Sequence, residues 1–449
     1  MNNEFITILA LLIGIAVLII GTVKLKIHPF FSLLAASFTF GIISGMGMEN
    51  ALEAFTEGMG GTIAGIGIVI AIGTVTGSLL EKSGAVETMA QSILKVTGEK
   101  HASLGLAITG YLVSIPVFCD AAVVLLAPIA KRISKDTKIS MTALAVSLTM
   151  GLHATHMFVP PTPGPLAVAG ILGADLGYVI GFGAIVSIPV MLVAHFLGDK
   201  MGKKYYFVPD DIEELDENHT LPSPFMSFIP IILPVILMLI KTFSDMTIGK
   251  EGANNLAVNI INFVGTPMIA LLIGMIIALI GYFKIFPGDK SVYSFDGEFG
   301  ESLKTAGQIV LIVGAGGAFG GVLKASELQN ILVDFFSGID IGILAPFIIG
   351  AIFRTAIGSG TVAMVTAASM LAPLLDVLGM GSPMGRVIAM LACASGGSMI
   401  FHANDDYFWV ASSTMGIDTG TAYKTFTVAS IAQSITGIIV VFILKAILL

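Results

Sequence analysis

Long apolar segments constrain this chain more than any other feature. They recur along most of its 449 residues, and many reach the ~20 residues that an α-helix needs to cross a bilayer. Only 12% of the residues are charged, compared with roughly a quarter in soluble domains. Backbone groups in lipid must hydrogen-bond within a helix or a closed barrel, and segments this long exclude the barrel. The sequence therefore predicts an all-α, polytopic membrane protein, with candidate spans at 5–23, 27–46, 59–80, around 231–241 and 257–283.

Three smaller features complete this class assignment. The first apolar segment has neither a basic region before it nor a small-residue cleavage signature after it, so we expect a retained helix rather than a signal peptide. The cysteines, Cys119 and Cys393, lie in different apolar segments and suggest no disulfide framework. Much of the net charge of -8 comes from "PDDIEELDE" at 209–217, which we expect to form a solvated loop.

Two halves of the sequence resemble each other. "GTVTGSLLEKS" from Gly73 matches "GGAFGGVLKAS" from Gly316, "LLAPIAKR" matches "MLAPLLDV", and "GADLG" matches "GIDTG". The matches are collinear at a nearly constant spacing of about 244 residues, which indicates a duplicated unit. Such repeats are typical of secondary transporters, in which the substrate site lies between the halves near the middle of the membrane.

The distribution of charge predicts how each half is threaded. Basic residues near positions 24, 90, 135 and 200 place those loops in the cytoplasm, and the acidic segment near position 50 lies outside. The segment between the basic loops at 100 and 131 must then return to the same side, as a re-entrant hairpin broken at Pro116 with Asp120 at its tip. The repeat predicts a second hairpin whose tip is "FRTAIGSGTVAM" at 353–364. Five crossings and one hairpin per half make the repeats inverted, with the hairpins entering from opposite sides.

We divide the chain accordingly. Residues 1–198 form the first repeat, with scaffold helices in 1–50 and the first hairpin and broken helix in 51–198. An acidic hydrophilic linker covers 199–224. Residues 225–449 form the second repeat, with scaffold helices in 225–290 and the second hairpin and broken helix in 300–449.

Each half also contains a polar interruption after an apolar run. "HATHMFVPPTPGP" at 153–165 holds four prolines that a continuous helix does not tolerate, so we expect extended chain there. Its counterpart, "HANDDYFW" at 402–409, combines an imidazole, an amide and two carboxylates. Irregular backbone at membrane depth survives only when it is buried in protein or lines a cavity, so the two breaks and the two hairpin tips should converge on one cavity.

Ionisable residues inside a membrane are by default a hypothesis of function. We expect one group of polar residues to bind substrate, with Arg354 and the helix N-termini holding an anion and the others contacting hydroxyl groups: Arg354, Ser359, Thr361, Thr162, Asn404 and His402. We expect a second group to carry a coupling proton: Asp120, Asp405, His153 and His156. Of the adjacent Asp405 and Asp406, one should be functional and the other structural or solvated.

Structural interpretations compete with these roles. Arg354 could extend to the membrane interface, and Asp120 could cap the second arm of its hairpin. His153 and His156 share a helical face but lack a third ligand at suitable spacing, so we expect no metal site and no cofactor. The glycine-rich stretch 314–321 follows no strand, which favours close helix packing over a nucleotide loop.

Four of the motifs resemble a known family. "HMFVPPTPGPLAVAGILGADLG", "GAGGAFGGVLKAS", "AIGSGTVAMVTAA" and "HANDDYFW" resemble, in order and over essentially the whole chain, the gluconate:proton symporters of the ion transporter superfamily. The resemblance implies proton-coupled uptake of gluconate or a related small hydroxy or sugar acid across a bacterial inner membrane. The superfamily implies an elevator-type homodimer with a scaffold and a mobile transport domain, and no nucleic-acid partner. Family members often have His in place of Thr162 and Glu in place of Asp120.

Other functions remain open at this point. A sodium- or proton-coupled carrier of another small carboxylate, such as D-serine or glycerate, would use the same broken helices to bind its ion. A membrane-embedded enzyme is disfavoured because no nucleophile and base lie at suitable spacing, and a passive channel because hairpins and broken helices imply an occluded site.

Overall fold

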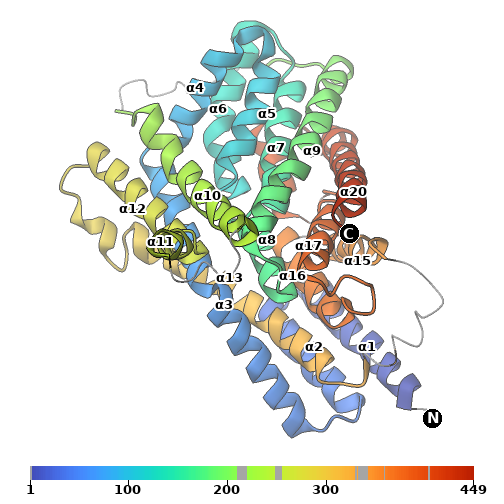
Figure 1. The fold of residues 1–449 in the computed structure, drawn as a ribbon. Coiled ribbons are helices and arrows are strands. Elements are labelled where there is room, and N and C mark those ends of the chain that lie inside the picture. The colour runs from blue at the N-terminus through green and yellow to red at the C-terminus, as the bar shows by residue number, and fades with distance from the viewer. Residues whose placement is uncertain are drawn as a thin grey trace.

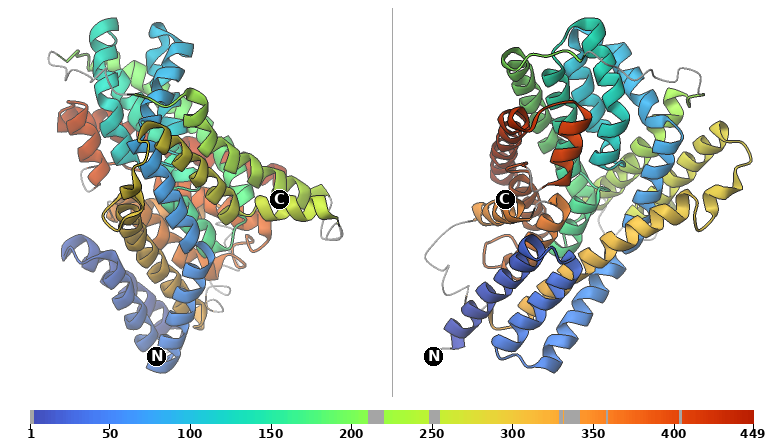
Figure 2. Two further views of the ribbon diagram at one scale, coloured as in Figure 1. Left: turned by 90° about the vertical axis from the view of Figure 1, so that its left-hand side faces the viewer. Right: turned by 180° about the vertical axis from the view of Figure 1, so that it is seen from behind.

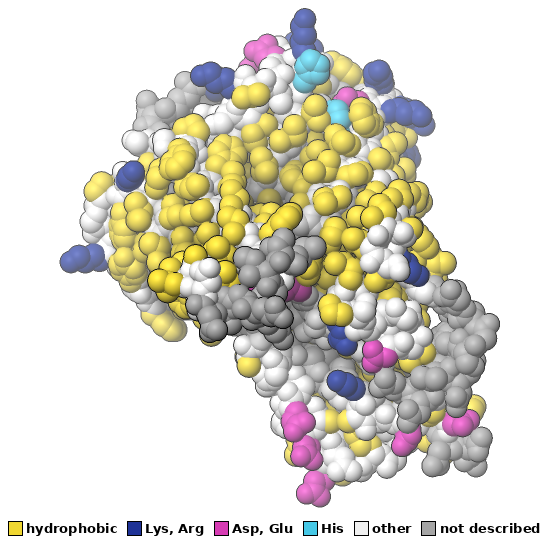
Figure 3. All heavy atoms as spheres, in the orientation of Figure 1, with side chains coloured by type: hydrophobic (Ala, Val, Ile, Leu, Met, Phe, Trp, Pro, Cys, Tyr) yellow, Lys and Arg dark blue, Asp and Glu magenta, His cyan; other side chains and the backbone are white. Residues whose placement is uncertain are grey.

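The computed structural model describes residues 3–209, 220–247, 255–328, 331, 342–357, 359–402 and 405–449. All regular secondary structure in these ranges is helical, so the predicted all-α class is confirmed (Figure 1). Eight of the described helices are long and apolar enough to cross a membrane. Figure 3 shows a broad apolar surface across the middle of one face, with basic side chains around its upper edge and acidic ones at its lower tip.

In the first half of the chain, a π-helical turn at Ile20–Lys24 follows the first helix. The helices of this half are α1 Asn3–Ile19, α2 Pro29–Ile43, α3 Met48–Lys82, α4 Ala85–Thr97, α5 Ala102–Val113, α6 Cys119–Thr137, α7 Met141–Phe158, α8 Pro163–Leu172 and α9 Leu176–Lys204.

The described helices of the second half follow a similar succession of long and interrupted helices. Their bounds are α10 Pro224–Thr247, α11 Leu256–Val264, α12 Pro267–Ile285, α13 Glu298–Lys324, α15 Leu344–Ala356, α16 Gly360–Leu371, α17 Pro383–Gly397, α18 Asp406–Thr414, α19 Thr419–Ala422 and α20 Val428–Leu448. The acidic segment expected to link the halves lies mostly outside the described residues.

One expected membrane span is divided. The sequence predicted a continuous helix over 257–283, but α11 ends at Val264 and α12 begins at Pro267. Thr266, the N-cap of α12, has extended backbone angles (φ −63°, ψ 132°). Proline has no N–H to donate and fits the first turn of a helix, where that donor is not needed, so Pro267 starts a new helix instead of continuing the old one.

Helices α3 and α13 run side by side (Figure 2). They approach each other closely at glycines. A Cβ atom added at Gly317 would lie 1.9 Å from Thr62 Oγ1, and one at Gly58 would lie 2.6 Å from the Gly317 carbonyl oxygen. At Gly321 an added Cβ would lie 2.7 Å from the Ala54 carbonyl oxygen. The expectation that the glycine-rich stretch 314–321 serves helix packing is therefore confirmed.

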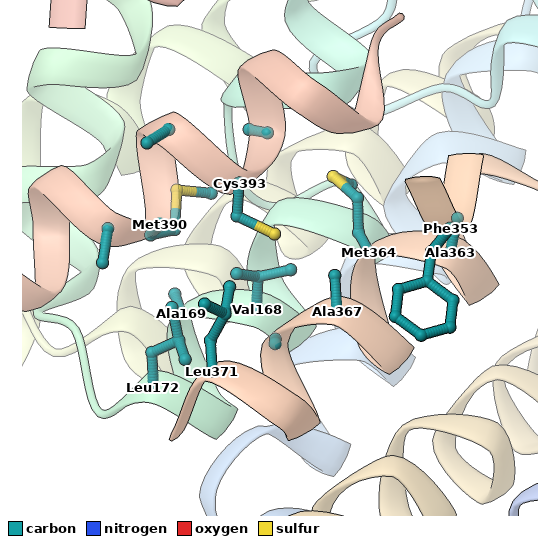
Figure 4. Packing of buried hydrophobic residues seen from close by; sticks show 14 of the residues in the cluster. Val168, Ala169, Leu172, Phe353, Ala363, Met364, Ala367, Leu371, Met390 and Cys393 are labelled. Atoms are coloured by element: carbon teal, nitrogen blue, oxygen red, sulfur yellow. The ribbon is translucent and has the colours of Figure 1, made fainter. Parts of the chain in front are cut away.

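A shared apolar core joins the two halves. It brings α8 of the first half against α16 and α17 of the second, through buried side chains that Figure 4 shows at close range, including Val168, Leu172, Met364, Leu371 and Cys393. Helix α7 is the most enclosed element, because every residue from Met141 to Phe158 is buried except His156. The ends of α7, α8, α16 and α17 are therefore held in the interior, which is where the predicted breaks lie.

Candidate functional site

Four helix interruptions lie in the interior of the fold. They separate α5 from α6 at 114–118, α7 from α8 at 159–162, α15 from α16 at 357–359 and α17 from α18 at 398–405. At the second of these, the extended chain is shorter than the sequence suggested. Val159 and Thr162 are extended, but Pro163 and Pro165 occupy the first turn of α8, where their missing N–H groups cost nothing, and His153 and His156 remain helical in α7.

Three of the four interruptions border one cavity of ≈ 150 Å³, and α7, which ends at the remaining interruption, also lines it. Its lining includes Asp120 from the start of α6, His153 and His156 from α7, Arg354 from α15, Ser359 and Thr361 at the start of α16, and Asp405 at the start of α18. The structure thus brings together residues that lie up to about 285 positions apart and that the sequence analysis selected by their chemistry.

Arg354 and Asp405 form an ion pair at this cavity. Arg354 lies in the last turn of α15 and is 2% exposed, so the alternative in which it extends to the membrane interface is wrong. Asp405 is 7% exposed and is the N-cap of α18, where its Oδ1 accepts a hydrogen bond of 2.9 Å from the Tyr407 N–H. The guanidinium also lies 5.9 Å from the centre of the Phe401 ring. The pair therefore connects the second hairpin to the second broken helix.

Asp120 lies in the first turn of α6, but it is not the cap. The N-cap of α6 is Phe118, so the structural alternative in which Asp120 is the N-cap of the second hairpin arm is wrong. The Asp120 side chain is exposed at the cavity, and its position near a helix N-terminus stabilises a negative charge.

The two histidines have incompletely satisfied rings. His153 is 2% exposed, and its Nδ1 donates a hydrogen bond of 3.1 Å to Gln433 Oε1. Its Nε2 is buried and has no hydrogen-bond partner among the described residues, and the same holds for His156 Nδ1. Within the described ranges no group of three His, Cys, Asp or Glu residues has a geometry that could hold a metal ion.

The start of α16 supplies further polar groups to the cavity. Ser359 is the N-cap of this 12-residue helix and accepts a hydrogen bond of 3.5 Å from the Val362 N–H. A Cβ atom added at Gly360 would lie 3.2 Å from Arg354 Nη1, so the glycine lets the guanidinium approach the helix N-terminus closely. The unsatisfied N–H groups of such a terminus and the adjacent guanidinium together can bind an anion.

The comparisons with known proteins agree with this architecture. The family model for GntP family permeases matches residues 6–447. The chain belongs to this family of permeases. The expected resemblance is therefore confirmed, as are the transporter class and the location as a multi-pass protein of the bacterial inner membrane.

Similar proteins differ in what their names say they carry. The permease is 38% identical to an uncharacterized permease of Haemophilus influenzae, over 92% of this chain and 86% of the other. It is 30% identical to a gluconate permease of Pseudomonas aeruginosa (100% and 99% covered) and 32% identical to the D-serine transporter DsdX of Escherichia coli (100% of both). In fold, it is similar to the YdaH transporter of Alcanivorax borkumensis, with a TM-score of 0.64, 15% identity and 90% of each chain covered.

Two described residues that were predicted for the site of the permease, Thr162 and His402, do not line the cavity. Thr162 is buried at the first break and donates hydrogen bonds to the carbonyl oxygens of His156 (3.1 Å) and Val159 (2.6 Å), so it holds the broken backbone together. His402 is half-buried and its Nε2 donates to the Thr355 carbonyl oxygen at 3.3 Å. Asn404 lies outside the described residues, as does the side chain of Asp406.

Two further residues of this region, Tyr407 and Gln433, were not among the predicted site residues. Tyr407 lines the cavity and donates a hydrogen bond of 3.0 Å from its Oη to the Thr149 carbonyl oxygen. Gln433 is fully buried and contacts His153. The available signal for Gln433 was a single amide within the apolar segment "SIAQSITGIIVVF".

Glycines of α3 and α13 allow both hairpins to approach closely. A Cβ atom added at Gly77 of α3 would lie 2.3 Å from the Pro116 carbonyl oxygen at the tip of the first hairpin. On α13, one added at Gly316 would lie 2.2 Å from Val365 Cγ1 of α16. The segments that begin at Gly73 and Gly316 are those that match in sequence; one of them contacts the connection between α5 and α6, and the other contacts α16.

Proposed function

We propose that this permease is a secondary active transporter that carries gluconate, or a related small hydroxy or sugar acid, into the cell together with a proton. One observation carries the proposal: a buried arginine is paired with a buried carboxylate in a cavity bordered by three of the four helix interruptions and by α7. Gluconate and D-serine, named for two of its relatives, are both carboxylates. A guanidinium that binds carboxylates in two-point fashion is suited to the group that these substrates share.

Arg354 and the N-terminus of α16 would hold the substrate carboxylate. Both lie at the same wall of the cavity, because Gly360 admits the guanidinium next to the first turn of α16. Ser359 and Thr361 would hydrogen-bond the hydroxyl groups of the substrate, with Asn404 and His402 as further contacts expected from the sequence. Thr162 would support the site by closing the break between α7 and α8.

The ion pair gives a physical route to proton coupling. A substrate carboxylate that reaches Arg354 must compete with Asp405, and displacing Asp405 would leave a buried carboxylate without its partner, which typically costs about 3–5 kcal/mol. A proton on Asp405 removes that cost, so substrate and proton each favour the binding of the other. Asp405 is therefore our first candidate for the proton carrier, and Asp120, His153 and His156 are the other titratable groups predicted for this role.

The architecture expected from the sequence belongs to the same proposal. Two inverted repeats would form an elevator-type carrier in a homodimer, with scaffold helices in 1–50 and 225–290 and the moving hairpins and broken helices in 51–198 and 300–449. By this division nearly all of α3 and α13 would move together with the hairpins, and their close glycine contacts with the hairpins are consistent with one rigid moving part.

A second candidate is a sodium- or proton-coupled carrier of another small carboxylate such as D-serine or glycerate. The 32% identity to a D-serine transporter over the full length of both chains favours retaining it. The same cavity would serve, with Asp405 and Asp120 available to a cation and Arg354 to the carboxylate.

Purified protein in proteoliposomes tests these proposals. Labelled gluconate should accumulate when an inward proton gradient is imposed, and a protonophore should abolish the accumulation. Accumulation that ignores the protonophore but disappears when choline replaces Na⁺ would favour sodium coupling. Competition by unlabelled gluconate, glycerate and D-serine then ranks the substrates, and failure of all three to compete would reject the proposed substrate class.

A further inference from the structure

A buried glutamine connects the last membrane helix to the cavity. Gln433 of α20 is 0% exposed and makes three hydrogen bonds. Its Nε2 donates to the carbonyl oxygens of Met150 at 2.8 Å and Val190 at 3.4 Å, and its Oε1 accepts from His153 Nδ1 at 3.1 Å. Met150 and His153 belong to α7 and Val190 belongs to α9, so two neighbouring helices hold the amide.

These contacts determine which way the amide points. The two backbone carbonyls can only accept hydrogen bonds, so the amide NH₂ must face Met150 and Val190. The opposite orientation would put two acceptor oxygens 2.8 Å apart. The Gln433 oxygen therefore faces His153, and Nδ1 of that ring must carry the hydrogen of the contact.

The assignment of Nδ1 determines the character of the other ring nitrogen. A neutral imidazole has a single N–H, so Nε2 of His153 is left with a lone pair and acts as an acceptor. This Nε2 is buried and has no partner among the described residues, although its ring lines the cavity. Buried acceptors are normally satisfied, so the atom is suited to a hydrogen-bond donor that arrives with the substrate.

The charges around His153 favour the neutral ring. Arg354 borders the same cavity, and both side chains lie against the ring of Phe401, at centroid distances of 5.7 Å for the imidazole and 5.9 Å for the guanidinium. The other titratable groups lining this cavity are Asp120 and Cys119 of α6, His156 of α7, Asp405 and Tyr407. A second positive charge next to Arg354 would be repelled, and Asp405 is already paired with Arg354.

We propose that Gln433 is a positioning residue that holds His153 in the Nδ1–H tautomer, so that Nε2 accepts a hydrogen bond from a hydroxyl group of the substrate. The tautomer follows from the geometry alone, whereas the substrate contact rests on the function proposed above. Gln433 itself does not touch the substrate. His153 then serves recognition of a hydroxyl group rather than transport of the proton.

Two substitutions separate the roles of the ring nitrogens. His153→Asn keeps an N–H donor near the position of Nδ1, and so keeps the contact to Gln433, but removes the acceptor at Nε2. Gln433→Met keeps the length and burial of the side chain but removes both the donor and the acceptor. Ser434→Ala is the matched control, because Ser434 is a neighbouring buried residue of α20 that donates to the Ser395 carbonyl oxygen at 2.7 Å and has no role in the site.

The tautomer is tested without any substrate. Solid-state NMR of ¹⁵N-histidine-labelled protein in lipid distinguishes the two neutral tautomers, and the difference from His153→Asn identifies the signals of His153 among the seven histidines. We expect Nδ1–H in the wild type and in Ser434→Ala, and a gain of the Nε2–H form in Gln433→Met. An Nε2–H ring in the wild type would overturn the inference, whatever the transport assays show.

The substrate contact is tested by competition with gluconates that each lack one hydroxyl group. In the wild type and in Ser434→Ala, at least one deoxy compound should bind about tenfold more weakly than gluconate, the effect of one lost hydrogen bond. In His153→Asn that compound and gluconate should bind equally weakly. If His153→Asn still discriminates between gluconate and that deoxy compound as strongly as the wild type does, Nε2 does not bind the hydroxyl group. A wild type that ignores gluconate would reject the proposed substrate instead, and the NMR result would still decide the tautomer.

Discussion

Arg354 and Asp405 form a buried ion pair between the end of α15 and the start of α18. Asp405 has a second task, because it caps α18 through the Tyr407 N–H. An aspartate that both caps a helix and neutralises a guanidinium can lose its charge and keep its structural role. The two roles of Asp405 can be tested separately, because asparagine is as good an N-cap as aspartate.

We predict that Asp405→Asn uncouples transport from protons. Asparagine keeps an oxygen for the Tyr407 N–H, so α18 should remain intact, but it carries no proton in exchange for substrate. Exchange of labelled against unlabelled substrate across proteoliposomes should persist, whereas accumulation driven by a proton gradient should fall to the background. Accumulation at the wild-type level in this variant would show that another group carries the proton, and Asp120→Asn would be examined next in the same assay.

The pair also makes a prediction about stability. Arg354→Gln leaves Asp405 buried without its partner, which typically costs about 3–5 kcal/mol of the free energy of unfolding. The double variant, which also carries Asp405→Asn, leaves no unpaired charge buried. Its free energy of unfolding should therefore recover part of that loss despite the second substitution. Chemical unfolding in detergent measures both, and additive losses in the double variant would mean that the two side chains do not interact.

Thr162 gives a prediction with a closely matched control. Its hydroxyl donates to the carbonyls of His156 and Val159 where α7 is interrupted, and it is 3% exposed. Thr162→Val preserves the shape and removes the donor, so we expect a loss of about 1–3 kcal/mol and slower transport. Thr162→Ser keeps the hydroxyl and should remain close to the wild type in both thermal unfolding and uptake rate. Equal behaviour of the two variants would show that the hydroxyl does not support the break.

The four interruptions illustrate how much the sequence alone can predict. Proline at 116, 160 and 161 and the polar runs at 353–364 and 402–409 are incompatible with continuous membrane helices, so each interruption was located before the structure. Three of them border one cavity, as expected from the rule that irregular backbone at membrane depth must be enclosed. The same local reasoning failed at Pro267, which begins a helix that the apolar pattern had joined to its predecessor.

Which of these residues contact each other was harder to predict from the sequence. Nothing in the spacing of Arg354 and Asp405 along the chain indicates that they pair, because the contact depends on how α15 and α18 pack. Capping by Asp120 was an open alternative, and only the position of Phe118 at the start of α6 excludes it as the N-cap. The Gln433 amide is oriented by the backbone carbonyls of Met150 and Val190, which no side-chain motif in the sequence could reveal.

The last prediction concerns contact between α3 and the first hairpin. Ala at Gly77 would place its Cβ 2.3 Å from the Pro116 carbonyl oxygen, and a backbone atom cannot move aside as a flexible side chain can. We expect Gly77→Ala to displace the hairpin, lower the stability by about 1–3 kcal/mol and slow transport strongly. Gly60→Ala on the same helix is the control, because nothing lies within 4 Å of its added Cβ, and alanine should stabilise an exposed helical position. If both variants transport at the same rate, close contact of the hairpin with α3 is not needed for transport.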